Sequence, residues 1–339
     1  MNRWVRLGGY ALALSGLAYF LYLSRAVLVP FVLAAAIAYV LEPPVRELER
    51  RGLPRGLAIL AVYLGVSALM ALAVWFFLPL LVEELNRLAE AIPEYTVRVR
   101  DFVRHMQTDY SRMPMPENVR RVLDEAIAGT EARLLNSIGD AITGLFALFA
   151  SLLRVLIAPV LAFYMLRDLD DFRRRIKGFL PPATSRQWLA LLHEVDGVVG
   201  GFIRGQVLVA VVVGILTGAA LYLLRIRFAT LLAIVAALGE FIPYFGPIVA
   251  AIPAVFVGFL TSPLKALQVL VAVTLIQQLD ATVVGPKILG DRTGLHPLLV
   301  IFAVLTGGYL FGPWGLLLAV PVGAVIRVLL KHGLLRLRP

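Results

Sequence analysis

The chain has 339 residues, of which 60% are hydrophobic and only 16% are charged, and its mean hydropathy is +0.86. Soluble domains usually contain about 25% charged residues, so this composition excludes an ordinary soluble protein. We assign the net charge of +10 to Lys and Arg that orient membrane loops, and not to nucleic-acid binding. The chain contains no cysteine and its four histidines are far apart, so we expect no disulfide, metal or other cofactor.

Apolar runs long enough to cross a bilayer, about 17–25 residues each, recur along the chain. They do not alternate between polar and apolar residues, as the strands of an outer-membrane barrel would. The sequence therefore predicts an all-α, polytopic integral membrane protein with about eight membrane segments, some of them broken or re-entrant. A helical extracytoplasmic insert is expected to interrupt the membrane part.

Residues 1–82 are expected to form the N-terminal membrane helices, with a break at Ser24–Pro30. The predicted spans are 7–23, 27–41 and 57–82. The loop EPPVRELERRGLPRG precedes the third span and carries four arginines, which predicts a cytoplasmic position.

The rest of the chain divides by charge and hydropathy. Residues 83–140 have helical periodicity and many charges, which predicts a soluble extracytoplasmic insert. A span at 141–166 follows, and then a basic, amphipathic cytoplasmic region at 167–205. Further membrane helices at 206–330 lead to a cytoplasmic tail. The tail comprises residues 331–339.

The stretch GEFIPYFGPIVAAIPAVFVGFL, residues 239–260, breaks an apolar run with three prolines and an acid. Proline inside a helix removes a backbone hydrogen bond, and an interrupted backbone at membrane depth survives only against protein or water. We therefore expect a broken-helix hairpin with Glu240 as an ion- or proton-coupling residue. The alternative is that Glu240 caps a helix at the interface. The expected hinge residues are Gly239, Pro243, Gly246, Pro247, Pro253 and Pro286.

A second polar group lies in LIQQLDATVVGPKILG. Gln277 and Asp280 are three residues apart and share a helix face, and Gly285 and Pro286 are expected to end the helix. We expect Asp280 to couple a cation or proton. The alternative for these side chains is interhelical hydrogen bonding. The expected substrate-binding residues are Tyr244, Gln277, Gln278 and Thr282.

The final apolar stretch is also interrupted, at Gly307–Gly308 and at Gly312–Pro313. FGPIVAAIP (245–253) and FGPWGLLLAVP (311–321) are similar, which hints at two related broken elements around one site. His296, which precedes this stretch, is expected to lie at the interface.

Four motifs together resemble the autoinducer-2 exporter family of bacterial permeases. They are PFVLAAAIAYVLEPPVRELERRGLPRGLAIL, GEFIPYFGPIVAAIPA, IQQLDATVVGPKILG and GLHPLLVIFAVLTGGYLFGPWGLLLAVP. The resemblance covers about residues 26–330 apart from the insert. It implies a multi-pass bacterial inner-membrane permease that forms a homo-oligomer, a pentamer. Family members often have Asn where Glu42 stands, and Glu with a nearby Asn where Asp280 and Thr282 stand.

These observations favour a secondary transporter that exports a small polar solute such as a signalling molecule, coupled to an ion or passive. A Na⁺(Li⁺)/H⁺ antiporter that binds only monovalent cations is the alternative, and a non-transporting membrane scaffold is a third. The chain has no GxxxxGK[ST] motif to bind a nucleotide, and no GxSxG or HExxH motif, so we expect no enzyme and no catalytic residue. Both termini are expected in the cytoplasm, and no nucleic acid is expected as a partner.

Overall fold

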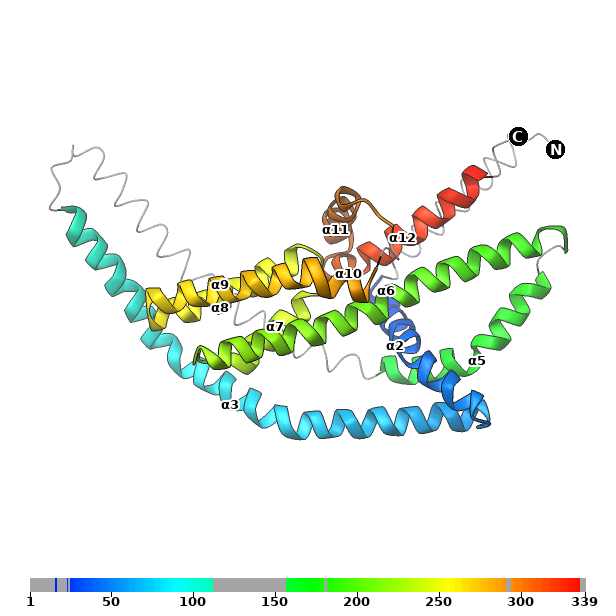
Figure 1. The fold of residues 1–339 in the computed structure, drawn as a ribbon, viewed down its shortest axis with the longest axis horizontal. Helices are drawn as coiled ribbons and strands as arrows, with labels where there is room; N and C mark the ends of the chain where they lie inside the picture. The colour runs from blue at the N-terminus through cyan, green and yellow to red at the C-terminus, as the bar shows by residue number, and fades with distance from the viewer. Residues whose placement is uncertain are drawn as a thin grey trace. The chain divides into compact units, whose positions relative to one another are not determined.

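A computed structural model describes residues 25–111, 157–179, 182–290 and 294–335, with the isolated residues 16 and 23. These residues form helices and no β-strand (Figure 1). The described helices are α2 (Arg25–Arg50), α3 (Arg55–Ser111), α5 (Ile157–Phe179), α6 (Pro182–Leu223), α7 (Ala229–Gly239), α8 (Phe245–Thr261), α9 (Pro263–Leu279), the π-helix η2 (Asp280–Val284), α10 (Gly285–Ile288), α11 (Pro297–Phe311) and α12 (Pro313–Leu335).

Four helical stretches in the described ranges are long and apolar enough to cross a membrane. They are Arg55–Leu88, Trp188–Leu223, Pro263–Ile288 and Pro313–His332. Three further apolar helices, α7, α8 and α11, are shorter than these four stretches, with 10–17 residues each. The prediction of an all-α polytopic membrane protein is therefore confirmed.

The chain forms two compact units. The first comprises Met1–Ala68, Val155–Leu208 and Pro286–Pro339, and the second comprises Leu69–Arg154 and Val209–Gly285. In the first unit, α2 packs on α3 and α5 around buried Val45, Ile59 and Leu166. In the second, α7, α8 and α9 share a core with the middle of α3 and the end of α6.

Small residues allow α6 and α7 to approach closely within the second unit. A Cβ atom on Gly214 would lie 2.8 Å from the Ala237 methyl group, and one on Gly218 would lie 3.0 Å from that of Ala233. Such contacts between small residues are typical of membrane helix pairs. They bring the helix that leads to Glu240 against α6.

The prediction of a loop directly after the second span is wrong for the residues up to Arg50, because α2 continues through Pro43 and Pro44. Ion pairs across one helical turn support this extension, such as Glu42 with Arg46 at 2.6 Å. Pro30 also lies inside α2, which begins at Arg25, so it does not break the chain there. The turn that ends α2 falls at residues 51–54.

Other predicted boundaries do not coincide with helix ends. α3 continues past residue 82, and α6 continues through residue 206. The division into membrane, insert and tail segments therefore remains a prediction. Of the predicted span at 7–23, only residues 16 and 23 are described, and residues 112–156 and 336–339 lie outside the described residues.

In the first unit, α11 and α12 form a hairpin (Figure 1). It turns at Gly312, whose φ of 63° favours glycine. Gly307 and Gly315 pack backbone to backbone, since a Cβ on Gly307 would lie 2.5 Å from the Gly315 carbonyl oxygen. The expected interruption at Gly307–Gly308 is wrong, because both glycines lie inside α11 and provide this close approach.

The start of α7 is capped by a different helix. Its own N-cap residue, Phe228, supplies no side-chain cap. Instead, the Glu84 carboxylate of α3 accepts hydrogen bonds from the backbone nitrogens of Thr230 at 3.3 Å and Leu231 at 2.7 Å. A carboxylate at a helix N-terminus satisfies free N–H groups and complements the helix dipole.

We expect Glu84→Ala to lower the free energy of unfolding by about 1–2 kcal/mol, the usual loss when a helix cap is removed. Urea unfolding in mixed micelles, followed by circular dichroism, measures this change. Glu83→Ala is the matched control, because the exposed Glu83 only pairs with Arg87 along the same helix. Equal stability losses in the two variants would contradict the role of Glu84 as a cap.

Candidate transport site

The predicted broken-helix stretch forms a helical hairpin. α7 ends at Gly239, residues 240–244 form the turn, and α8 begins at Phe245. The two helices meet where a Cβ on Gly239 would lie 2.8 Å from the Gly246 carbonyl oxygen. A Cβ on Gly246 would overlap the Gly239 carbonyl oxygen, so only glycine fits there. The hairpin therefore depends on glycine at both positions.

The turn itself is backbone-strained. Tyr244 has φ 66° and ψ −47°, a region that residues with a side chain rarely adopt. Pro243 lies in the turn, and Pro247 lies in the first turn of α8. Pro253, by contrast, lies inside the continuous helix α8, so the structure does not place a break there.

The turn brings Glu240 against α9. Glu240 is only 4% exposed, and its Oε1 accepts a hydrogen bond of 3.1 Å from Gln277 Nε2. Asp280 lies one helical turn beyond Gln277, close enough to Glu240 for the two carboxylates to interact electrostatically. The structure thus joins the two polar groups that the sequence shows thirty-seven residues apart.

Asp280 stands at a change of helix type. α9 ends at Leu279, and Asp280 opens the π-helix η2, in which the backbone N–H of Gly285 bonds to the Asp280 carbonyl. Single-turn π-helices are uncommon and occur frequently at functional sites. The Oδ1 atom of Asp280 is buried, with no hydrogen-bond partner in the described part of the chain. A proton or a cation would satisfy this oxygen.

The expectation that the helix ends at Pro286 is wrong. The chain remains helical through η2 and α10 to Ile288. The π-helical turn provides the physical reason, since its wider spacing changes the register just before the proline and places it in the first turn of α10.

Three expected substrate-binding residues do not join the carboxylate pair. Gln278 is exposed on a neighbouring face of α9, and Thr282 donates its hydroxyl proton to the Gln278 backbone carbonyl at 2.6 Å. Tyr244 is 50% exposed in the turn. His296 caps α11, where its Nδ1 accepts from the backbone N–H of Leu298 at 3.3 Å.

The structure also shows polar groups that sequence reasoning missed. Gln206 and Thr217 are buried along α6, and Glu42 is buried in α2. Lys265 donates to the Leu224 carbonyl at 2.7 Å and so caps the end of α6. Polar residues inside an apolar run were the available signal for Gln206 and Thr217, whereas the burial of Glu42 and the Lys265 contact depend on tertiary packing.

Helices of spanning length, short paired helices and a buried carboxylate at a broken segment define a polytopic helical membrane transporter. The AI-2E family transporter model matches residues 11–335, so the chain belongs to this family.

Individual relatives agree with this family membership. The AI-2 transport protein TqsA of Escherichia coli (strain K12) is 25% identical over 337 residues, which cover 97% of this chain and 91% of TqsA. Two proteins of Bacillus subtilis (strain 168), named as candidate transport proteins, are also similar. YrrI is 29% identical over a region that covers 91% of this chain and 87% of YrrI. YueF is 28% identical over a region that covers 88% of this chain and 82% of YueF.

Proposed function

We propose that this transporter exports a small polar solute and that Glu240, Gln277 and Asp280 couple the flux to a proton or a monovalent cation. The observation that carries the proposal is the buried Glu240 carboxylate at a helix break, bonded to Gln277 and close to Asp280. Ionisable groups at membrane depth are costly, and transporters retain them to bind substrates and coupling ions.

The family relationship supports a small signalling molecule as the solute. One relative is named for transport of AI-2, and it aligns with nearly the whole chain. AI-2 is therefore the first solute to test. By the same reasoning we propose a multi-pass protein of the bacterial inner membrane with both termini in the cytoplasm, assembled as a homo-oligomer, a pentamer by resemblance.

A Na⁺(Li⁺)/H⁺ antiporter is the second candidate, and the arrangement of the two carboxylates favours it. Asp280 Oδ1 has no hydrogen-bond partner in the described residues. The side-chain N–H of Gln277 donates to Glu240, which leaves the Gln277 amide oxygen as a further ligand. Carboxylate and amide oxygens are ligands for hard cations. An antiporter of this kind needs no organic solute.

Flux in proteoliposomes distinguishes these functions. The purified protein is reconstituted with a pH dye inside, a pH gradient is imposed, and labelled AI-2, Na⁺ or Li⁺ is added separately. AI-2 movement that responds to the gradient supports the exporter, whereas proton movement driven by Na⁺ or Li⁺ alone supports the antiporter. Flux of none of these above that of protein-free liposomes would contradict both proposals and favour the scaffold.

A further inference from the structure

Helix α2 contains two consecutive prolines in its interior, Pro43 and Pro44. A proline has no backbone N–H, and its ring pushes against the carbonyl four residues earlier. Pro43 therefore cannot donate the backbone hydrogen bond that the Tyr39 carbonyl would receive in an uninterrupted α-helix. The helix nevertheless continues to Arg50, and the Tyr39 carbonyl can accept from a donor on another helix.

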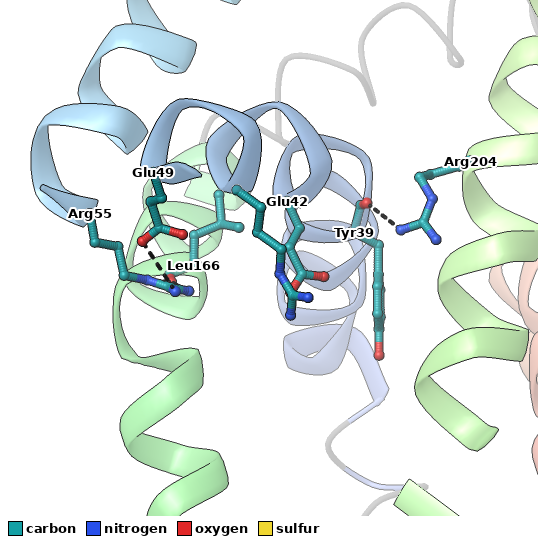
Figure 2. Close-up of polar contacts among 7 residues, drawn as sticks. Tyr39, Glu42, Glu49, Arg55, Leu166 and Arg204 are labelled. Atoms are coloured by element: carbon teal, nitrogen blue, oxygen red, sulfur yellow. Dashed lines mark hydrogen bonds and ion pairs between the residues drawn. The ribbon is translucent and has the colours of Figure 1, made fainter. Parts of the chain in front are cut away.

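Arg204 of α6 provides that donor. Its Nη1 donates to the Tyr39 carbonyl oxygen at 3.1 Å, and Figure 2 shows the guanidinium directed at this oxygen from the neighbouring helix. Arg204 is half-buried, where a charge-assisted hydrogen bond is stronger than in water. Tyr39 and the part of α6 that carries Arg204 both belong to the first unit.

The packing beside this contact supports a built arrangement. Gly200 lies one turn before Arg204, and a Cβ at that position would lie 2.8 Å from Tyr39 Cδ1 and 3.1 Å from Arg204 Nη1. The glycine thus leaves room for the Tyr39 ring and the guanidinium together. This second observation, independent of the hydrogen bond, indicates that the absence of a side chain at Gly200 accommodates this contact between α6 and α2.

We propose that Arg204 is a positioning residue for transport, because it supplies the Tyr39 carbonyl with the hydrogen bond that Pro43 cannot make, and so ties to α6 the bend that an interior proline gives a helix. A donor within α2 would move together with the Tyr39 carbonyl, so the conformation of α2 would not depend on another helix. Because the donor is Arg204 of α6, the conformation of α2 depends on the position of α6. Glu240, Gln277 and Asp280 belong to the other unit. We assign to Arg204 an effect on the rate of transport through α2, and no direct contact with the solute.

A double-mutant cycle tests this assignment, because Pro43→Ala restores the missing N–H group. The four proteins are the unsubstituted chain, Arg204→Ala, Pro43→Ala and the double variant. Spin labels on cysteines at Phe31 and Glu47, both exposed, report the bend from either side of Pro43. The native chain has no cysteine to compete for label, and the positions are about 24 Å apart along a helix.

We expect Arg204→Ala to broaden the distance distribution in the native background and to change it little in the Pro43→Ala background. The maximal rate of flux should fall about tenfold in the first background and less than twofold in the second, with an unchanged half-saturating concentration. Arg204→Gln, which keeps a donor, provides a milder second variant, and the exposed Arg50→Ala is the charge control.

Equal broadening in both backgrounds would overturn the proposal, because Arg204 would then act on a group other than the Tyr39 carbonyl. An unchanged distribution in the native background would overturn it as well. The distance measurement needs no solute, so it decides the role of Arg204 even if AI-2 proves not to be transported.

Discussion

Replacing Glu240 with glutamine is expected to reduce gradient-driven flux by at least about tenfold, within the usual range of coupling between two sites. Glutamine has nearly the same shape, and its amide oxygen can still accept the hydrogen bond from Gln277 Nε2. It cannot release a proton or neutralise a cation. The variant should therefore assemble normally and exchange solute without response to a pH gradient.

The measurement compares tracer flux with and without an imposed pH gradient, at equal amounts of reconstituted protein. Glu47→Gln is the control, because Glu47 is exposed and pairs with Arg50 of its own helix and with Arg51 directly after it. Loss of flux in both conditions would indicate a folding defect, and thermal unfolding of the purified variant would reveal it. Coupling that survives in Glu240→Gln at native strength would exclude Glu240 from the coupling site.

The second large effect concerns the hairpin. Gly246→Ala is expected to lower the free energy of unfolding by about 3 kcal/mol or more, because the new methyl group meets the Gly239 carbonyl and not a flexible side chain. The two helices must then separate, which moves the turn that carries Glu240 away from Gln277. Solute flux should be lost together with stability.

Gly65→Ala is the matched control for this substitution. Gly65 lies inside α3 with no atom within 4 Å of the position that a Cβ would occupy. Alanine has the higher helix propensity, so this control should be neutral or slightly stabilising. Unfolding of both variants in detergent by urea gives the comparison. Equal stability of Gly246→Ala and the unsubstituted chain would show that the helices can part without loss.

Much of the fold is readable from the sequence, because long apolar runs report membrane helices directly. The short helix before Glu240 and the reversal after it follow from Gly239 and Pro243 in an apolar run. The extent of α2 does not, because a proline signals a missing donor but cannot reveal the Arg204 side chain that supplies another. The continuation through Pro286 was hidden for a similar reason, since a π-helical turn leaves no local sequence signature.

The candidate site was predictable residue by residue but not as a constellation. Glu240, Gln277 and Asp280 are conspicuous as polar residues in apolar surroundings, and the structure brings them together. Gln278 and Thr282 were grouped with them because they are neighbours in sequence, yet successive helical residues point about 100° apart. The place of Gln278 on another face of α9 follows from that geometry, and the Thr282 hydroxyl, in η2, bonds to the Gln278 carbonyl. The cap from Glu84 depends on tertiary packing, so no local pattern predicts it.

The most direct test follows protons and solute together in proteoliposomes that contain either the unsubstituted protein or the double variant Glu240→Gln/Asp280→Asn. A pH dye and labelled AI-2 are read at once, with Na⁺ present or absent. We expect the unsubstituted protein to move protons in step with AI-2 or with Na⁺. We expect the double variant to move none while it remains folded and reconstituted. Native proton movement in the double variant would contradict coupling through these two carboxylates.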